Sequence, residues 1–222
     1  MPRIFLYLLL LSSQMAGAQL RKDYLFSSLS IRNGLISEET VDVQQDSKGF
    51  IWIATVDGLQ RYEGRRLLTF RHIEGDSTSM PNDNIAQMRL DKKNRLWLLF
   101  NENKVGYINP ADLSFHLVPV NISINITNRA ITQLIVDDDG NVMLLLYKIG
   151  TYAYDEEKKE FNSKNLPRFE VPKTWNPIFI RKDKSPGIYW IACDSGLVKY
   201  DQRKKVMYYR DHGDEQDPLL WA

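Results

Sequence analysis

The sequence has little of the chemistry on which many enzymes and nucleic-acid-binding proteins depend. It contains one cysteine and three histidines in 222 residues, and its 29 Lys and Arg residues nearly balance its 28 Asp and Glu residues. Because no broad basic field can form from so balanced a charge, we expect no nucleic-acid partner. Cys193 alone cannot form a disulfide within the chain. His72, His116 and His212 lie far apart in the sequence, so we expect structural rather than catalytic roles for them.

Motifs for catalysis or cofactor binding are also missing. The sequence has no paired His or paired Cys motif, no glycine-rich phosphate loop and no Gly-x-Ser-x-Gly motif. The acidic run at 137–139 starts like a calcium loop, but Lys148 stands where the loop requires Glu. We therefore expect a non-enzymatic chain with no catalytic residue, no metal and no cofactor.

No apolar run approaches the roughly 20 residues that a membrane-spanning helix needs. The longest run at the N-terminus, Ile4–Leu11, follows Arg3 and precedes a small, polar stretch that ends Ala16-Gly17-Ala18. This order of charge, apolar run and small residues predicts a cleaved signal peptide over residues 1–18. An exported chain without a disulfide suits the periplasm of a Gram-negative cell.

What the sequence does contain is a repeat of 45 to 46 residues. Four β-rich runs each close on an aspartate, and a short polar turn and a second apolar run follow. The aspartates are Asp46, Asp91, Asp137 and Asp183, and a shared position in the second run holds Trp52, Trp97, Met143 and Trp190. A third run begins at Gly58 in the first copy and Gly196 in the fourth, and carries Tyr62, Ile108, Tyr154 and Tyr200 at a spacing of 46. We align the fourth run on Phe70, Phe115, Phe161 and Met207.

The repeat predicts an all-β fold of about four four-stranded antiparallel β-propeller blades. Short β-rich runs with a turn signal every 8 to 12 residues are typical of all-β proteins, and about 40 to 50 residues is the usual length of a four-stranded blade. Tandem β-sandwiches would need about 100 residues per unit. The first strand of each blade should line the central axis and the fourth should lie at the rim.

The repeat also divides the chain. The predicted segments are a signal peptide (1–18), an N-terminal segment with a strand that can close a ring (19–40), blade 1 (41–84), blade 2 (85–130), blade 3 (131–176), blade 4 (177–212) and a tail (213–222). Four such blades should leave edges unpaired, so we expect an open arc that is prone to pair with a second copy.

The first copy carries a resemblance to a known family. Residues 29–37 read LSIRNGLIS and residues 43–64 read VQQDSKGFIWIATVDGLQRYEG. These stretches resemble the start of the two-component regulator propeller family, in which they open the periplasmic sensor region of Bacteroidetes hybrid histidine kinases. The match is strong in the first copy and recognisable in Ile188–Asp201, whereas the second and third copies are degenerate.

The resemblance implies a longer parent protein. Such sensors carry two seven-bladed propellers, a β-sandwich, an inner-membrane helix, a kinase, a receiver and a DNA-binding domain, and their usual ligands are glycan fragments. By this resemblance the chain is an N-terminal fragment or the product of a truncated gene, and its partners are a carbohydrate, the remaining blades and signalling domains, and a second copy of itself.

Candidate ligand-binding residues follow from the propeller topology. Loops between the second and third strands, and loops leading into the next blade, share the face by which propeller ligands commonly enter. The candidates are Arg129, Tyr147, Lys148, Trp175 and Asn176. An aromatic ring beside amide and charged groups suits a sugar ring, although packing between blades or at the rim is the alternative for Trp175. Two other functions stay open: a polysaccharide lyase or hydrolase, which needs clustered carboxylates, and a protein-binding propeller, which needs an apolar loop face.

Overall fold

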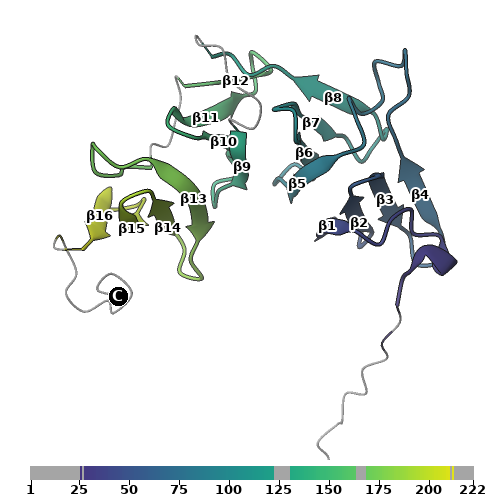
Figure 1. The fold of residues 1–222 in the computed structure, drawn as a ribbon, viewed down its shortest axis with the longest axis horizontal. Coiled ribbons are helices and arrows are strands. Elements are labelled where there is room, and N and C mark those ends of the chain that lie inside the picture. Colours follow the sequence, from purple (N-terminus) through teal and green to yellow (C-terminus); the bar gives the residue numbers. More distant parts are fainter. Residues whose placement is uncertain (1–25, 27, 123–130, 164–168, 211, 213–222) are drawn as a thin grey trace, which may run out of the picture.

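The chain folds into four separate four-stranded sheets that follow one another along an arc (Figure 1). The computed structural model describes residues 26, 28–122, 131–163, 169–210 and 212. Each sheet is antiparallel with its strands in sequence order, so each is a simple meander. The predicted all-β propeller fold is confirmed, and the only helical element in the described residues is the short 3-10 turn η2 (Ile31–Asn33).

The strands of the first two blades occupy residues 40–70 and 85–118. They are β1 (Thr40–Gln45), β2 (Ile51–Thr55), β3 (Gly58–Tyr62), β4 (Leu67–Phe70), β5 (Ile85–Leu90), β6 (Leu96–Phe100), β7 (Val105–Ile108) and β8 (Phe115–Val118).

The strands of the third and fourth blades occupy residues 131–162 and 177–209. They are β9 (Ile131–Val136), β10 (Val142–Leu146), β11 (Gly150–Asp155), β12 (Glu160–Asn162), β13 (Pro177–Lys182), β14 (Ile188–Cys193), β15 (Gly196–Asp201) and β16 (Val206–Tyr209).

The first strand of every blade lies on the inner side of the arc. Figure 1 shows β1, β5, β9 and β13 on the concave side, with β4, β8, β12 and β16 outermost. Each inner strand also has an irregularity near its start, where the pairing with the second strand skips one residue. The skipped residues are Val41, Ala86, Thr132 and Ile178, again 45 to 46 positions apart. The bulge therefore recurs in every blade, although the four residues at this position share no residue type that would predict it.

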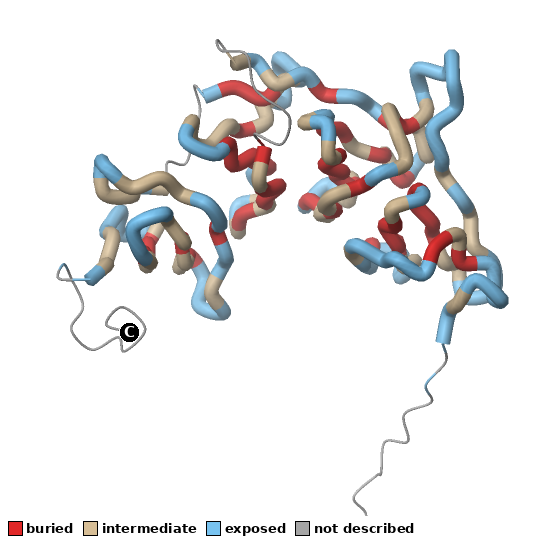
Figure 2. The backbone as a smooth tube through the Cα atoms, viewed as in Figure 1, coloured by how far each residue is buried: buried red, intermediate tan, exposed pale blue. Residues whose placement is uncertain are grey.

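The hydrophobic cores lie between blades. Trp52 and Ala54 of blade 1 pack with Met88 and Leu98 of blade 2, and equivalent clusters join blade 2 to blade 3 and blade 3 to blade 4. Strands β6 and β10 are buried at every position, as expected for strands covered on both faces (Figure 2). Each blade thus depends on its neighbours for most of its burial.

The alignment of the fourth strand in blade 1 is wrong by three residues. Tyr62 pairs with Leu67, whereas Ile108, Tyr154 and Tyr200 pair with Phe115, Phe161 and Met207. Leu67, and not Phe70, is therefore the counterpart of those residues. The reason is a shorter turn between β3 and β4, which made the spacing from Phe70 to Phe115 coincide with the repeat.

The segment before β1 forms no strand in its described part, residues 26 and 28–39. It lies against blade 1 instead, where the backbone N–H of Ile36 donates to Oε1 of Gln60 (3.0 Å) and Nε2 of Gln60 donates to the carbonyl of Gly34 (3.0 Å). Closure of a ring by this segment stays a prediction. The predicted signal peptide and the tail at 213–222 lie outside the described residues.

Candidate ligand-binding site

The repeated aspartates and tryptophans are joined by a hydrogen bond, which explains why they recur together. In blade 1 the carboxylate of Asp46 accepts the backbone N–H groups of Lys48 and Phe50, and its Oδ2 accepts the indole N–H of Trp52 (2.9 Å). Asp91 with Trp97 and Asp183 with Trp190 repeat the indole bond, each at 2.8 Å. The side chain thus holds the tight turn and positions the ring in the core between blades.

In blade 3 a side chain other than tryptophan donates the hydrogen bond to the turn aspartate. Met143 occupies the ring's position and has no N–H to donate, but the side-chain amide of Asn141 donates to Oδ2 of Asp137 (2.8 Å). Blade 3 is therefore degenerate in sequence and intact in its hydrogen bonding.

The repeated glycines and tyrosines also act structurally. Gly58 and Gly196 have φ of 128° and 152°, and a Cβ at Gly196 would lie 2.8 Å from Cη2 of Trp175. Burial raises the pKa of Tyr154 to about 12, as expected for a ring in the packed interface between blades. Burial likewise raises the pKa of Cys193 to about 11, so its thiol is a poor nucleophile.

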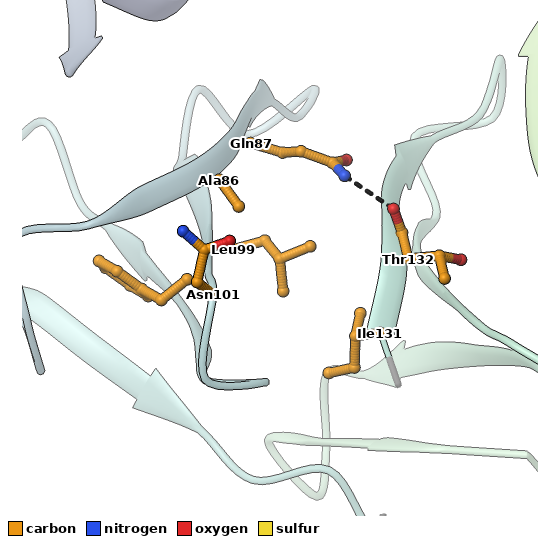
Figure 3. A pocket seen from close by; sticks show the side chains of 7 residues that line it. Ala86, Gln87, Leu99, Asn101, Ile131 and Thr132 are labelled. Atoms are coloured by element: carbon orange, nitrogen blue, oxygen red, sulfur yellow. Dashed lines mark hydrogen bonds between the residues drawn. The ribbon is translucent and has the colours of Figure 1, made fainter. Parts of the chain in front are cut away.

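A cavity of about 350 Å³ lies between blades 2 and 3, at the ends of their inner strands (Figure 3). Its lining residues are Ala86 and Gln87 of β5, Leu99 and Phe100 of β6, Asn101 of the following turn, and Ile131 and Thr132 of β9. We call this the interblade pocket. Its volume falls at the lower end of the ~300–1,000 Å³ that small-molecule sites occupy.

The interblade pocket combines apolar walls with a few fixed polar groups. Leu99 and Phe100 are buried, while the amide of Asn101 is held by a bond from its Nδ2 to Oδ1 of Asn84 (2.7 Å). Nε2 of Gln87 donates to the carbonyl of Thr132 (2.8 Å), the dashed line in Figure 3. Such a site can accept a small, neutral molecule that has an apolar face and several hydroxyl groups.

The predicted candidates that the structure describes do not line the interblade pocket, but Tyr147, Lys148 and Asn176 lie close together near blade 4. The side-chain amide and backbone N–H of Asn176 both donate to Asp194, at 2.7 and 3.0 Å, and these bonds lower the pKa of Asp194, with a further contribution from the charge of Lys148. The Lys148 ammonium lies over the ring of Tyr147 (5.2 Å to the centroid), and Tyr147 is 40% exposed. Arg129 lies outside the described residues.

Trp175 packs against the protein. Its ring contacts Tyr209 edge-on (5.3 Å between centroids) and lies over Gly196. Residues of blade 4 therefore cover much of the ring surface that a sugar would need. This is the alternative that the sequence left open for this residue. A role in ligand binding would require the ring to leave these contacts.

Sequence reasoning missed Gln87 and Ala86 as pocket residues. The signal that could have found them is the repeat: the residue four before each closing aspartate is Asp42, Gln87, Gln133 or Phe179. At three of the four positions this side chain accepts a backbone N–H from the next inner strand, from Met88, Leu134 and Ile180 respectively.

Catalytic or metal-binding groupings do not emerge from the described part of the chain. Within it, no three His, Cys, Asp or Glu side chains are arranged to hold a metal ion, and no helix is long and apolar enough to cross a membrane. The ring of His116 stacks on Tyr107 (5.0 Å), and Nδ1 of His72 lies 2.7 Å from the carbonyl of Met80. These contacts are structural.

The fold is similar to that of the extracellular domain of BT3049, described as a hybrid two-component system of B. thetaiotaomicron. The two share 20% sequence identity with a TM-score of 0.63, over 89% of this chain and 27% of that one. The fold is also similar to that in the structure of YCF48 bound to D1 peptide, over 81% of this chain and 54% of that one, at 10% identity with a TM-score of 0.51. At these identities the similarity establishes the fold alone.

In sequence, the chain is 33% identical over 58 residues to Histidine kinase P4 of Formosa agariphila. That match covers 26% of this chain and 4% of the kinase, so the chain spans a small part of the proteins it is similar to. No protein-family model matches the sequence. The similar proteins therefore include the extracellular domain of a hybrid two-component system and a histidine kinase.

Proposed function

We propose that this chain is a non-catalytic, extracytoplasmic ligand-sensing module of a two-component system. The observation that carries the proposal is the similarity of its blades, over 89% of the chain, to an extracellular domain of such a system. The local match to a histidine kinase and the predicted signal peptide support the same assignment. The signalling domains would belong to a longer parent protein.

We propose further that the ligand is a glycan fragment and that it binds in the interblade pocket. A sugar ring offers C–H faces that suit Leu99 and Ile131, and hydroxyl groups that suit the side-chain amide of Asn101. A ligand that contacts both β6 and β9 would stabilise the juxtaposition of blades 2 and 3, which is how binding could favour one conformation of the parent.

The lining of the interblade pocket favours binding over catalysis. A glycosidase needs two carboxyl groups about 5 to 10 Å apart. The described residues that line this pocket include no Asp, Glu or His.

Calorimetric titration of the protein without residues 1–18 against a panel of neutral oligosaccharides tests the proposal. We expect one class to bind, and Asn101→Ala to weaken that binding at least tenfold because an oriented amide is lost. Asn121→Ala is the matched control, because the side-chain amide of Asn121 also bonds to one other side chain, that of Glu160 at the rim. Binding that survives Asn101→Ala unchanged contradicts the pocket, and failure of the whole panel to bind contradicts the glycan ligand.

A further inference from the structure

The outer edge of β4 in blade 1 is open along the rim of the arc (Figure 1). At the turn between β3 and β4, the backbone N–H of Glu63 donates to the carbonyl of Arg66 (3.0 Å). In an antiparallel pair only every second residue directs its backbone groups at the partner strand. The register of β3 and β4 therefore turns the N–H and C=O groups of Leu67 and Thr69 away from β3. No residue that the structure describes forms a backbone hydrogen bond with these outward groups.

The outer strands of the other three blades each have a described partner at one of these outward positions. The N–H of Phe115 in β8 donates to the carbonyl of Thr78 (3.1 Å), and the N–H of Phe161 in β12 donates to the carbonyl of Pro119 (2.9 Å). In blade 4 the N–H of Tyr209 donates to the turn that follows β16. Blade 1 differs, because both outward residues of its outer strand are open.

A cavity of about 220 Å³ adjoins this edge, between the outer strands of blades 1 and 2. We call it the rim pocket. Its lining includes Thr69 and Phe70 of β4 and the apolar side chains of Met80, Ile108 and Phe115, which are each at most 5% exposed. The rim pocket is smaller than the ~300–1,000 Å³ of most small-molecule sites, so it suits one large side chain better than a whole ligand.

Basic residues flank β4 at both ends. Arg65 precedes the strand, Arg71 follows it, and both are exposed. Neither forms an ion pair with another residue in the described segments. The carboxylate of Asp76 also lines the rim pocket, but it accepts hydrogen bonds from the backbone N–H and the hydroxyl of Thr78 (2.8 and 2.6 Å). The edge therefore offers two uncompensated positive charges to a partner.

These charges favour an acidic partner over a second copy of the chain. If two β4 edges paired antiparallel in their symmetric register, Arg65 of each copy would lie opposite Arg71 of the other. Like charges directly opposite one another destabilise a pair of strands. An extended segment with acidic residues at both ends would instead attract both arginines.

We propose that the edge of β4 and the rim pocket together bind an extended, acidic segment of another protein. The segment adds a fifth strand to blade 1 by bonding to the outward groups of Leu67 and Thr69. One aromatic or large aliphatic side chain fills the rim pocket, and acidic residues on either side face Arg65 and Arg71. The surface shares no lining residue with the interblade pocket, so it stands whether or not a glycan binds there.

Fluorescence anisotropy with a labelled peptide tests the proposal on the whole chain without residues 1–18. The probe is a blocked peptide of sequence ETVFVTE, whose glutamates lie six positions apart, as Arg65 and Arg71 do, with phenylalanine midway. We expect saturable binding. The peptide KTVFVTK should bind about tenfold more weakly because two attractions become repulsions. The peptide ETVAVTE should bind at least tenfold more weakly because it lacks the side chain that fills the rim pocket.

Thr69→Pro removes an outward N–H group that makes no bond to β3, so it should weaken binding of ETVFVTE at least tenfold. Thr69→Ala removes the same hydroxyl but keeps the N–H group, and should bind like the parent chain. Leu117→Pro is the matched proline control, because Leu117 is the counterpart of Thr69 in β8. All three variants should keep the circular dichroism spectrum of the parent chain.

Arg71→Glu tests the charge without depending on the tolerance of β4 for proline. It should weaken binding of ETVFVTE about tenfold, whereas Lys158→Glu, in an exposed turn of blade 3, should leave it unchanged. Equal affinity of the parent chain and Arg71→Glu, equal losses in Thr69→Pro and Leu117→Pro, or no saturable binding of ETVFVTE would overturn the proposal.

Discussion

At the scale of single residues, each turn aspartate stabilises its blade by accepting hydrogen bonds both from the backbone of the tight turn and from a side chain in or before the second strand. One carboxylate oxygen accepts turn N–H groups, and the other accepts a side-chain donor from the second strand or its approach. Blade 3 shows that the donor is interchangeable, because the amide of Asn141 replaces an indole N–H. The bond is therefore the constrained feature, rather than the tryptophan.

Asn141→Ala tests this account. The change removes the described side-chain donor to Oδ2 of Asp137, a residue that is only 5% exposed, so a charged oxygen loses its partner. We expect a loss of about 1–3 kcal/mol in the free energy of unfolding, measured by urea denaturation. Asp139→Ala in the same turn is the control and should change stability by less than about 0.5 kcal/mol. Equal effects of the two substitutions would contradict the role assigned to Asn141.

The sequence predicted these residues because identical spacing in four copies is hard to produce by chance. It did not predict which atoms meet, since neither the indole bond nor its replacement by Asn141 is visible in composition. The candidate site was predicted less well. The loop face was inferred from topology, but Trp175 turned inward because Gly196 leaves room for its ring. The interblade pocket depends on the bulges in β5 and β9, which no residue type marked.

At the scale of elements, the inner strands are joined from blade to blade by side chains. Gln133 is 4% exposed, and its amide both donates to the carbonyl of Ile180 (2.6 Å) and accepts the N–H of Ile180 (2.7 Å). Gln87 likewise accepts the N–H of Leu134, the counterpart of Ile180, but it donates to the carbonyl of Thr132. These side-chain amides therefore form hydrogen bonds between inner strands that belong to separate sheets, from β5 to β9 and from β9 to β13.

Gln133→Leu should therefore destabilise the chain by about 2–4 kcal/mol. Leucine keeps the approximate volume but leaves the N–H and C=O of Ile180 buried without these partners. The measurement is the midpoint of urea unfolding, with Gln45→Leu as the control because Gln45 is exposed and bonds only within its own turn. If Gln133→Leu were as stable as the control, the strands would have to be held by apolar contacts alone.

The rims of blades 2 and 3 are joined by charge. Arg95 donates to both oxygens of Glu156, at 2.6 and 3.1 Å, and its guanidinium lies about 5 Å from the rings of Trp97, Tyr107 and Tyr154. Burial alone would raise the pKa of Glu156, but the hydrogen bonds from Arg95 and Lys93 outweigh it and lower the pKa. A carboxylate whose pKa is lowered by folding stabilises the protein at pH values above the ordinary pKa of that carboxyl group. This stabilisation is lost as the pH falls through the lowered pKa of the folded state.

Glu156→Gln should therefore cost stability at neutral pH and cost progressively less as the pH falls below the ordinary glutamate range. The side chain of Glu156 is 47% exposed, so solvent screening should keep the difference below about 1 kcal/mol. Urea unfolding of both proteins across this pH range measures it, with Glu157→Gln as the control. A difference that does not depend on pH would mean that the ion pair contributes nothing.

At the scale of the whole molecule, the described residues leave the outer faces of the first and last blades exposed. Met88, Leu134 and Ile180 are each at most 2% exposed because they pack on the preceding blade, whereas Val43, at the equivalent position of blade 1, is 56% exposed. At the other end, Trp190 is partly exposed, whereas Trp52 and Trp97 are fully buried against a following blade. The repeat thus presents at both ends the surfaces that it buries three times within the chain.

The central claim is that these blades form an open arc, and small-angle X-ray scattering of dilute protein without residues 1–18 tests it most directly. A compact domain of this length has a radius of gyration of about 17 Å. The arc predicts a clearly larger radius and an extended, asymmetric distribution of interatomic distances. A radius near the compact value with a symmetric distribution would mean that the four blades close on themselves, and would contradict the open arc.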